Sequence, residues 1–308
     1  MTQKTTVDWL RFRVQAEHPG QVLEALRPLF GDWGKHLGLG KHGRGLFGFQ
    51  HSLPVVIANQ MAIGRMDFGG ESQRGWIRVD VPGKGCAMVT DWDAIEEIEK
   101  LPSSEPRRLD LALTTWRGEV GHDDVVKGHN EGRFSTGGRP PNLQTIINSD
   151  NSGRTCYVGK RDSDKFFRGY EKGYELVGQM GNIPGIVTHI DGFRVEDIYR
   201  NEVEFKAESR PIPWQAIDRR DQYFAGAYPF CADVLPGVEA DILQRRPEKV
   251  IQRDLQAALA NARAQYGKTL FTALAAYHGD IGAVWDRIVA KEHNEALVAA
   301  GVLLVDHD

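Results

Sequence analysis

The sequence predicts an α+β fold in which one antiparallel sheet carries helices and is followed by a helical C-terminal region. Short segments with alternating apolar residues are separated by turns containing glycine and proline, which is typical of antiparallel strands. The expected elements follow the order strand, helix, strands, helix, strand. From residue 211 the apolar spacing becomes helical, so we expect an α+β domain at 1–210 and a mainly helical region at 211–308.

The composition excludes several classes of protein. The chain has 308 residues, of which 41% are hydrophobic and 26% charged, so a packed core is expected rather than disorder. The formal net charge of −4 excludes a uniformly basic nucleic-acid binder, so such binding requires a local patch. Three widely spaced cysteines indicate reduced thiols, and no apolar run is long enough to span a membrane. We therefore expect a cytoplasmic protein.

The first elements are expected between residues 7 and 51. Apolar residues alternate over 7–14, which predicts a strand that includes one acid, Asp8. Residues 20–30 have apolar side chains at helical spacing and predict a short amphipathic helix. The segment 31–51 is rich in glycine, histidine and lysine. It is either a phosphate-contacting loop or, as the more ordinary alternative, a solvated hairpin.

The next elements suggest a repeat. Short strands are expected within 45–68 and 75–81, each followed by a glycine-containing turn. Asp91 is suited to cap a helix, and residues 107–115 again alternate as a strand. This later strand and the one at 7–14 each place an acid after an apolar residue. The chain is therefore expected to contain a duplicated α+β unit.

A polar, glycine-rich segment at 117–152 is expected to be a long functional loop, because strand patterns resume after it. The strands expected next are 156–158, 165–172 and 198–206. In the C-terminal region, helical spacing predicts helices at 248–264, 269–278 and 281–299. Gly267 is expected to end the first of these helices.

Residues 154–172 combine positive charge with aromatic rings. Six cations, Arg154, Lys160, Arg161, Lys165, Arg168 and Lys172, are interspersed with four rings, Tyr157, Phe166, Phe167 and Tyr170. Cations contact phosphates and rings stack on bases, so this mixture favours a nucleic-acid strand as partner. The predicted DNA-binding residues are Lys160, Arg161, Lys165, Arg154 and Arg200.

Tyr170 is the candidate nucleophile within this stretch. If the strand continues to residue 172, Arg168 and Lys172 share the face of Tyr170, since residues two apart point the same way. Neighbouring positive charge favours phenolate, and an activated tyrosine can attack phosphorus. The ordinary alternative is a half-buried strand tyrosine. Tyr174 and Tyr157 are competing nucleophiles that lack this pairing.

Two acids are candidates for a metal site. Asp110 lies between leucines in an apolar strand, where a carboxylate is costly unless it is paired or ligates something. Its alternative role is a buried salt bridge to Arg107 or Arg108. Glu202 and Glu204 alternate with apolar residues and share one strand face, so they are either Mg²⁺ or Mn²⁺ ligands or part of a solvated edge with ion pairs.

Several motifs, in order, resemble those of the replication initiation factor family, the Rep-trans type of rolling-circle initiators. They are Arg108-Leu-Asp110-Leu-Ala, Gly153-x-Thr155-x-Tyr157-x-Gly159, Arg168-x-Tyr170-x-Lys172-x-x-Glu175 and Arg200-x-Glu202-x-x-x-Lys206. Residues 138–141 and 224–229 look like the filamentous-phage branch of this family. The resemblance spans about residues 7–232, and its specificity comes from the ordered set of motifs.

The resemblance implies a metal-dependent nickase and strand transferase of a phage or mobile element. Tyr170 would attack one strand at the origin and stay attached to the 5′ phosphate, leaving a free 3′ hydroxyl. Asp110 and Glu202 would be metal-site acids, with Mg or Mn as cofactor. The chain shows no ATPase motif, so a host helicase is implied; the family also suggests a homodimer, although no heptad pattern supports one.

One departure from the family pattern keeps other functions open. A second Asp of the family's acidic strand is replaced by Thr114, and Glu131 from the preceding loop is the candidate substitute ligand. This departure favours an alternative, a non-catalytic DNA-binding accessory or regulatory protein on the same scaffold. An RNA-binding module is a third class, because basic and aromatic strands also suit RNA.

Overall fold

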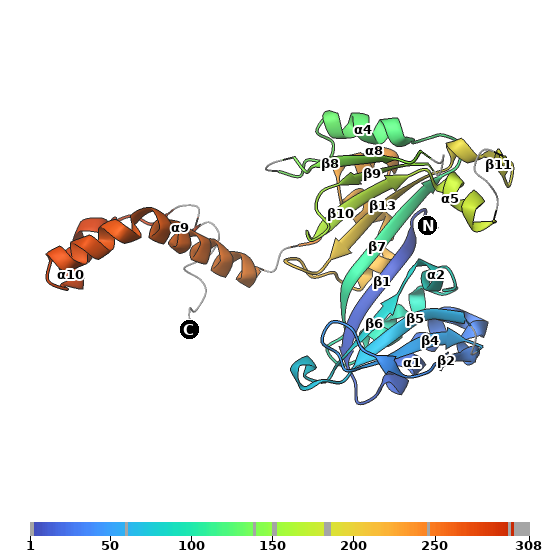
Figure 1. Ribbon diagram of the computed structural model, residues 1–308, viewed down its shortest axis with the longest axis horizontal. Coiled ribbons are helices and arrows are strands. Elements are labelled where there is room, and N and C mark those ends of the chain that lie inside the picture. The colour runs from blue at the N-terminus through green and yellow to red at the C-terminus, as the bar shows by residue number, and fades with distance from the viewer. Residues whose placement is uncertain are drawn as a thin grey trace. The chain divides into compact units, whose positions relative to one another are not determined.

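The computed structural model describes residues 3–58, 61–137, 140–149, 153–181, 186–244, 247–294 and 297–298 (Figure 1). Contacts divide the chain into two compact units, residues 1–243 and 244–308. This division differs from the boundary expected at residue 210. The helices between residues 215 and 234 pack into the same core as the sheet, so they belong to the first unit.

One sheet of 11 strands forms the first unit, and all its described pairings are antiparallel. The strands lie in the order β2 (Leu37–Leu39), β4 (His51–Ile57), β5 (Met61–Phe68), β6 (Trp76–Val81), β1 (Thr6–Gln15), β7 (Glu105–Thr115), β13 (Tyr199–Lys206), β10 (Lys165–Tyr170), β9 (Arg154–Val158) and β8 (Leu143–Ile147). Strand β3 (Gly43–Arg44) pairs with β4, while β11 (His189–Ile190) and β12 (Phe193–Arg194) form a separate hairpin. The predicted α+β class is confirmed.

The sheet repeats one topology twice. In each half a long strand, β1 or β7, is followed by a helix, α1 (Pro19–Leu26) or α4 (His122–Asn130). The chain then runs to the outermost strand, β2 or β8, and returns strand by strand until β6 or β13 pairs with the long strand. The two long strands pair with each other in the middle of the sheet. The strand order thus has the duplication that the sequence predicts.

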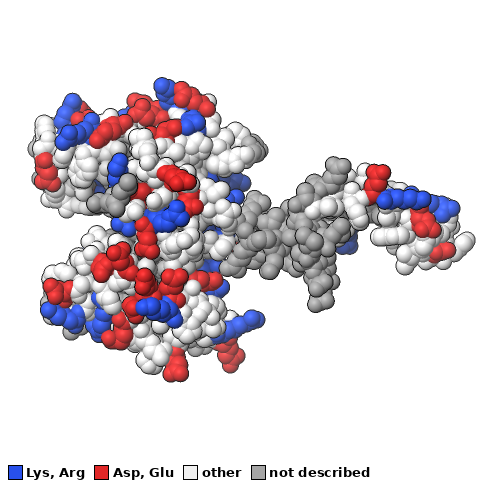
Figure 2. Space-filling model, turned by 180° about the vertical axis from the view of Figure 1, so that it is seen from behind, with Lys and Arg blue, Asp and Glu red and all other residues white. Residues whose placement is uncertain are grey.

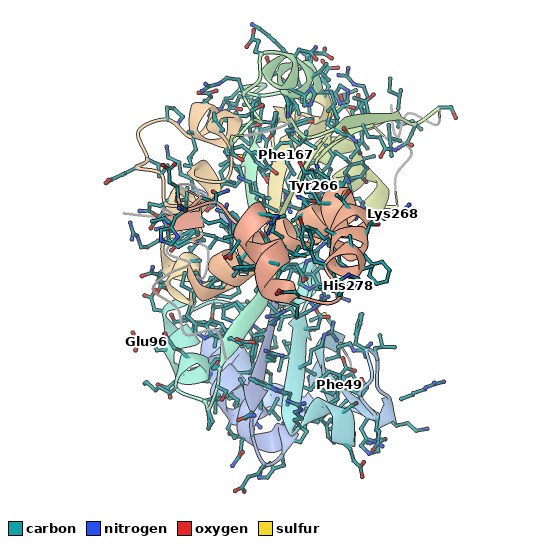
Figure 3. The ribbon with its side chains drawn as sticks, turned by 90° about the vertical axis from the view of Figure 1, so that its left-hand side faces the viewer. Phe49, Glu96, Phe167, Tyr266, Lys268 and His278 are labelled. Carbon is teal, nitrogen blue, oxygen red and sulfur yellow. The ribbon has the colours of Figure 1, made fainter. Side chains whose placement is uncertain are left out.

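Helices pack against one face of the sheet. Val22 of α1, Val125 of α4 and Phe224 of α7 lie in the same apolar core as Leu111 and Phe167 from the strands; Phe167 is labelled in Figure 3. The other helices of the first unit are η1 (Arg27–His36), η2 (Glu71–Gln73), α2 (Gly83–Cys86), η3 (Asp93–Ile95), α3 (Glu96–Glu99), α5 (Lys172–Gln179), η4 (Val195–Asp197), α6 (Gln215–Asp218), α7 (Arg220–Ala225) and α8 (Pro229–Val234). Because strand side chains alternate, the sheet's second face carries the polar residues.

The prediction of a long loop at 117–152 is wrong, because this segment contains α4 and β8. Helix α4 buries His122, Val125 and Gly128, which recur every third residue and so form one face. Only one of these three side chains is aliphatic, so the apolar periodicity is weak in the sequence. Burial of a histidine and a glycine against the sheet was therefore not predicted.

The strand expected at 165–172 ends at Tyr170, and helix α5 begins at Lys172. Gly173 explains the change of direction. A β-carbon at this position would lie 2.0 Å from the carbonyl oxygen of Val195, so the chain approaches that backbone more closely than any other residue allows. Lys172 then forms an ion pair with Glu175 one helical turn on, at 2.8 Å.

The second unit contains α9 (Pro247–Ala276) and α10 (Ile281–Ile288). Helix α9 continues through Gly267, where the sequence predicts an end; a glycine inside a helix costs only about 1 kcal/mol, which long helix-forming flanks can offset. The described part of α10 ends at Ile288, and some residues of the helix expected at 281–299 lie outside the described ones. Phe271 is 77% exposed and Tyr266, which is labelled in Figure 3, is 58% exposed.

Two expectations about the whole chain can be compared with the structure. None of the helices in the described ranges is long and apolar enough to cross a lipid bilayer. The three cysteines, Cys86, Cys156 and Cys231, are free and buried, in agreement with the reduced thiols that the sequence predicts.

Candidate functional site

The polar face of the second half brings most of the predicted site residues together. Three cross-strand rows connect β10, β13 and β7. In the first row Tyr170 lies opposite Arg200, in the second Arg168 lies opposite Glu202, and in the third Glu204 lies opposite Asp110. Since residues two apart on a strand share a face, these side chains point to the same side of the sheet. The site is therefore assembled by strand register.

Tyr170 is the last residue of β10 and is only 7% exposed. The guanidinium carbon of Arg168 lies 4.1 Å from the centroid of its ring, and the Lys172 ammonium lies 5.7 Å from it. The two cations predicted to flank the phenol are thus close to it. Lys172 reaches it from the first turn of α5, however, and not from the same strand face.

The ionisation of Tyr170 differs from the expectation. Burial raises the pKa of the Tyr170 phenol to about 12, although the charges of Arg200 and Arg168 act in the opposite direction. Glu175 and Glu202 contribute further in the upward direction. The neighbouring cations alone would lower the pKa of the phenol, but the cost of burying a phenolate is larger. In this structure the hydroxyl is therefore a neutral phenol at neutral pH.

Glu202 is a buried carboxylate with an unused oxygen. Its Oε2 atom has no hydrogen-bond partner within the described ranges, and Arg168 Nη2 lies 3.6 Å away. Burial raises the pKa of Glu202, and the charge of Arg168 only partly offsets this. A buried acceptor without a donor is costly unless a ligand or water supplies one.

Asp110 has a different environment. Arg108 donates to both of its carboxylate oxygens, from Nε at 2.8 Å and from Nη2. Arg108 Nη2 also lies 3.2 Å from Glu204 Oε2. Burial raises the pKa of Asp110 to about 7, and the hydrogen bonds from Arg108 oppose that rise. The salt-bridge alternative for Asp110 is thus present in the structure.

These acids fit a divalent cation only in part. Glu202 offers a free oxygen, whereas both oxygens of Asp110 already accept hydrogen bonds from Arg108. Glu131 follows α4 and is exposed, with Lys127 as its ion-pair partner at 3.9 Å. Helix α4 packs on the opposite face of the sheet, so Glu131 does not join the other two. In the described ranges, no three His, Cys, Asp or Glu residues are arranged to hold a metal ion.

Arg200 is held by two residues that the sequence analysis did not assign to the site. Its Nη1 atom lies 2.8 Å from Asp8 Oδ1, and its Nε atom donates to Thr114 Oγ1 at 3.0 Å. Thr114 therefore positions a cation where the family pattern has an acid. Asp8 enters the site from β1, next to a register shift in its pairing with β7. Only the alignment of β1 with β7 and β13 reveals this proximity.

The predicted DNA-binding residues do not form one track. Lys160 and Arg161 lie in the turn between β9 and β10, and Arg161 stacks over the rings of Tyr157 and Phe166 at 5.0 and 5.1 Å from their centroids. These two rings stack on each other at 5.6 Å. We call Tyr157, Phe166 and Arg161 the ring stack. Both ring-bearing residues lie on the polar face, in line with Tyr170 along the sheet.

Two other residues that were predicted to bind DNA, Arg154 and Lys165, do not join the ring stack. Arg154 is paired with Glu171 at 2.9 Å and with Asp123 of α4 at 3.1 Å, so its charge is largely neutralised. Lys165 alternates with Phe166 and therefore faces the helix-covered side. On the view of the first unit in Figure 2, basic and acidic side chains are intermixed and no uniformly basic patch is visible.

A model of the family described as "Replication initiation factor" matches residues 106–246, which confirms the resemblance of the motifs. A solved structure described as a rolling circle replication initiator protein from Geobacillus stearothermophilus also matches, with 21% sequence identity and a TM-score of 0.47. That match covers 66% of this chain and 74% of the other. No curated protein matches the sequence. The filamentous-phage branch remains a prediction, and residues 138–139 of its motif lie outside the described ones.

Proposed function

Because residues 106–246 match the replication initiation factor family, which supports a role in replication initiation, we propose that this chain nicks and rejoins origin DNA through Tyr170. The observation that carries the proposal is the position of Tyr170. Its phenol lies against the Arg168 guanidinium and near the Lys172 ammonium, on the sheet face that also bears the Glu202 oxygen without a hydrogen bond in the described ranges. A nucleophile, two cations and a free carboxylate are what phosphodiester transfer needs.

In the proposed reaction the Tyr170 oxygen attacks the scissile phosphorus. A bond forms between this oxygen and phosphorus, and the bond from phosphorus to the 3′ oxygen breaks. The phenol loses its proton and the departing 3′ oxygen gains one, so the products are a 5′-phosphotyrosine and a free 3′ hydroxyl. Attack by a 3′ hydroxyl on the phosphotyrosine reverses the step and rejoins the strand. No cofactor is consumed, which suits a nick that must later be sealed.

Arg168 and Lys172 are proposed to contact the non-bridging oxygens of the scissile phosphate. Both cations lie beside the phenol, so a phosphate that approaches the hydroxyl meets them. Arg168 also faces Glu202 at 3.6 Å, and a phosphate would compete with that carboxylate for the guanidinium. The scissile phosphate carries negative charge of its own, so Arg168 and Lys172 would have to offset that charge for the phenol to lose its proton during the attack.

Mg²⁺ or Mn²⁺ is proposed as the cofactor, with Glu202 as its ligand. When bound, such an ion would polarise the phosphate and neutralise developing negative charge. Asp110 could join Glu202 only if Arg108 turned away from it toward Glu204, which already lies 3.2 Å from Arg108. Binding of Mn²⁺ to the chain and to Glu202→Gln, followed by electron paramagnetic resonance, tests this ligand without any nicking assay.

The ring stack is proposed to hold the unpaired DNA strand beside the site. Its aromatic faces suit bases, and Arg161 with Lys160 supplies charge for phosphates. Tyr157 lies opposite Arg168 in the β9–β10 pairing, so a strand on these rings would run toward the tyrosine. Unwinding of the duplex is proposed to come from a host helicase, and a homodimer remains the expected assembly.

Covalent attachment of DNA tests the function most directly. The chain is incubated with Mn²⁺ and a supercoiled plasmid that carries the replicon encoding it. We expect an open circle with protein on its 5′ end. Tyr170→Phe removes one hydroxyl, so DNA affinity and folding should persist, while the adduct falls by roughly a thousandfold or more.

Matched controls identify the nucleophile. Tyr174→Phe and Tyr157→Phe make the same chemical change on α5 and β9, and both should keep the adduct. An adduct with Tyr170→Phe would refute the assignment, and its loss only with Tyr174→Phe would move the nucleophile to α5. Tyr174 packs partly in the small apolar cluster around Val177 and Val195, away from the acids.

A second function is favoured by one observation. Tyr170 is buried and both oxygens of Asp110 are bound by Arg108, an arrangement that also suits a DNA-binding protein without catalysis. Such a protein would bind the plasmid in the same assay and leave it supercoiled under every metal condition. The wild-type chain alone therefore distinguishes the two functions.

A further inference from the structure

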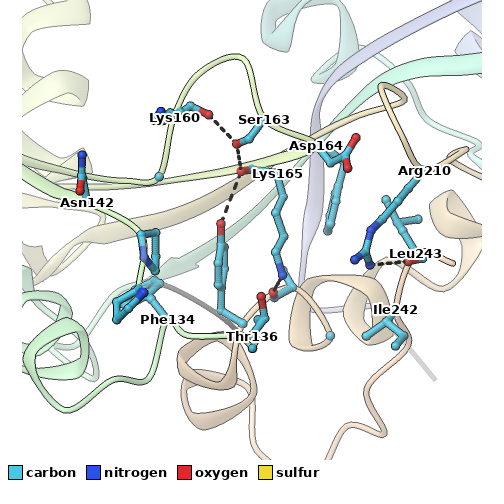
Figure 4. A pocket seen from close by; sticks show the side chains of 18 of the residues that line it. Phe134, Thr136, Asn142, Lys160, Ser163, Asp164, Lys165, Arg210, Ile242 and Leu243 are labelled. Atoms are coloured by element: carbon cyan, nitrogen blue, oxygen red, sulfur yellow. Dashed lines mark hydrogen bonds between the residues drawn. The ribbon is translucent and has the colours of Figure 1, made fainter. Parts of the chain in front are cut away.

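A cavity of about 680 Å³ lies at the start of β10, in the first unit (Figure 4). Lys165 opens into it, whereas Tyr170 ends the same strand, about 16 Å further along at the usual rise per residue. The two side chains also point to opposite faces of the sheet, because they are five residues apart. This cavity is therefore separate from the site around Tyr170.

Three cations line the cavity, Lys160, Lys165 and Arg210, and the last two hydrogen-bond to backbone carbonyl oxygens. Lys165 Nζ donates to the carbonyl oxygen of Ala227, and Arg210 Nη1 donates to that of Leu243 at 2.8 Å (Figure 4). Within the described ranges, neither side chain lies within salt-bridge distance of an acid. A half-buried ammonium and a neighbouring guanidinium thus share one cavity, an arrangement that is costly without an anion.

The two acids of the cavity wall are engaged elsewhere. Asp164 accepts hydrogen bonds from the backbone nitrogen of Ser209, at 2.6 Å, and from its hydroxyl. Asp241 pairs with Arg219 at 2.8 Å. Burial lowers the pKa of Lys165 to about 8, and the charge of Arg210 acts in the same direction. A bound anion would favour the charged ammonium and so oppose both effects on its pKa.

The remaining wall suits a flat aromatic ligand. Tyr228 lies along the Lys165 side chain, with its ring centroid 4.3 Å from the ammonium. Tyr228 and Phe134 are only 4% and 1% exposed, so the accessible apolar wall is formed by Pro140 and Pro141. A ligand with an anionic group and a planar ring would use both kinds of surface.

We propose that this cavity binds one nucleotide, its phosphate on Lys165 and Arg210 and its base against Pro140 and Pro141. Two sources share this chemistry, a residue of the DNA strand and a free nucleotide. The first source rests on the proposed function, the second does not. The DNA strand has a short route, because Gly159, Lys160 and Pro141 line both this cavity and the adjoining hollow that contains the ring stack.

Titration calorimetry on the full chain tests the site. The probes are deoxyadenosine 5′-monophosphate, deoxyadenosine, and a single-stranded oligonucleotide of mixed sequence. Lys165→Met and Arg210→Met remove the two cations separately, so the test survives if one variant misfolds. Lys100→Met is the matched control, because that lysine pairs with Glu97 on the surface. We expect each cavity variant to weaken binding of a phosphate-bearing probe about tenfold or more.

The probes whose binding the cavity variants weaken identify the source of the bound nucleotide. Saturable binding of the mononucleotide that each cavity variant weakens supports a free nucleotide; weakening confined to the oligonucleotide supports the DNA strand. Deoxyadenosine and Lys100→Met should show no such difference. The proposal is overturned if wild type binds neither phosphate probe, or if both cavity variants bind them as wild type does. A chain that binds in this way yet forms no tyrosine adduct would refute the proposed function and leave the nucleotide site standing.

Discussion

The two halves of the sheet have the same topology and opposite polar chemistry. On the first half, Asp67 of β5 is fully buried and is held by Arg65 and Arg78. Asp80 of β6 is held by Arg78 and Arg11. On the second half, the corresponding strands place Arg168 opposite Glu202, which keeps an unpartnered oxygen, and end at a tyrosine. We call the first arrangement the closed cluster and the second the open site.

This difference shows that two halves of one topology can have different roles, stabilisation in the first half and ligand binding in the second. In the closed cluster each carboxylate meets more than one guanidinium, and Phe47 covers Arg78 with its ring centroid 4.4 Å from the guanidinium carbon. All four carboxylate oxygens of Asp67 and Asp80 accept hydrogen bonds from the protein, and Arg65 Nε is a buried atom of the cluster that has no partner within the described ranges. In the open site, Glu202 Oε2 and Arg168 Nε have no hydrogen-bond partner in the part of the chain that the structure describes, so a metal or a phosphate can bind there. Chemistry is therefore expected only in the second half.

The largest expected effect is on the closed cluster. Arg78→Met leaves the buried Asp67 with one cation fewer, and should lower the free energy of unfolding by about 3 kcal/mol. Urea denaturation measures this change. Lys100→Met removes a surface cation just after the end of α3 and should leave the urea midpoint unaltered. An unchanged free energy of unfolding for Arg78→Met would show that the ion pairs of the closed cluster do not stabilise the fold.

Removal of a charge from the open site should have the opposite effect on the free energy of unfolding. The pKa of Glu202 is raised in the folded chain by burial, so the loss of stability begins as pH rises through the ordinary pKa of a glutamate and is complete above the folded pKa. Glu202→Gln should therefore be neutral or stabilise the chain by about 1 kcal/mol at pH 8, with a smaller gain at pH 5. Unfolding at the two pH values checks the sign. Marked destabilisation at pH 8 would show that Glu202 has a partner in solution.

The pH dependence of adduct formation sharpens the comparison further. Because the pKa of Tyr170 is about 12, the phenolate fraction should rise about tenfold per pH unit across the neutral range. Initial rates between pH 6.5 and 9 should follow that slope where chemistry limits the rate. A plateau near pH 7 would indicate that bound DNA or metal has brought the phenol's pKa down.

The smallest effect is expected in the DNA-binding turn. Neutralising Lys160 and Arg161 together should weaken DNA binding and flatten its logarithmic salt dependence by about one to two units. Arg154→Gln is the control, since Glu171 and Asp123 already neutralise that guanidinium. Binding at several salt concentrations gives the slopes. An unchanged slope for the double variant would place the phosphate contacts elsewhere, such as residues 35–44.

The sequence by itself determined the antiparallel α+β class, most strands and the set of residues that carry the family motifs. Alternation with period two is a local property, so β1, β7 and β13 could be located from single segments. The identity of Tyr170 as the candidate nucleophile also came from local residues, its neighbours Arg168 and Lys172. These features can be predicted without knowing which residues pack against them.

Only the tertiary structure decided which polar residues meet, and how strongly each is buried. Register brought Asp8 to Arg200 across the sheet, and placed Lys165 in a cavity on the opposite face from the ring stack. Burial raised the pKa of Tyr170 where neighbouring cations alone would lower it. Glu131 follows α4 and so lies on the other side of the sheet from the acids that it was expected to join. Pairing and desolvation depend on residues distant in the chain, and no local pattern reports them.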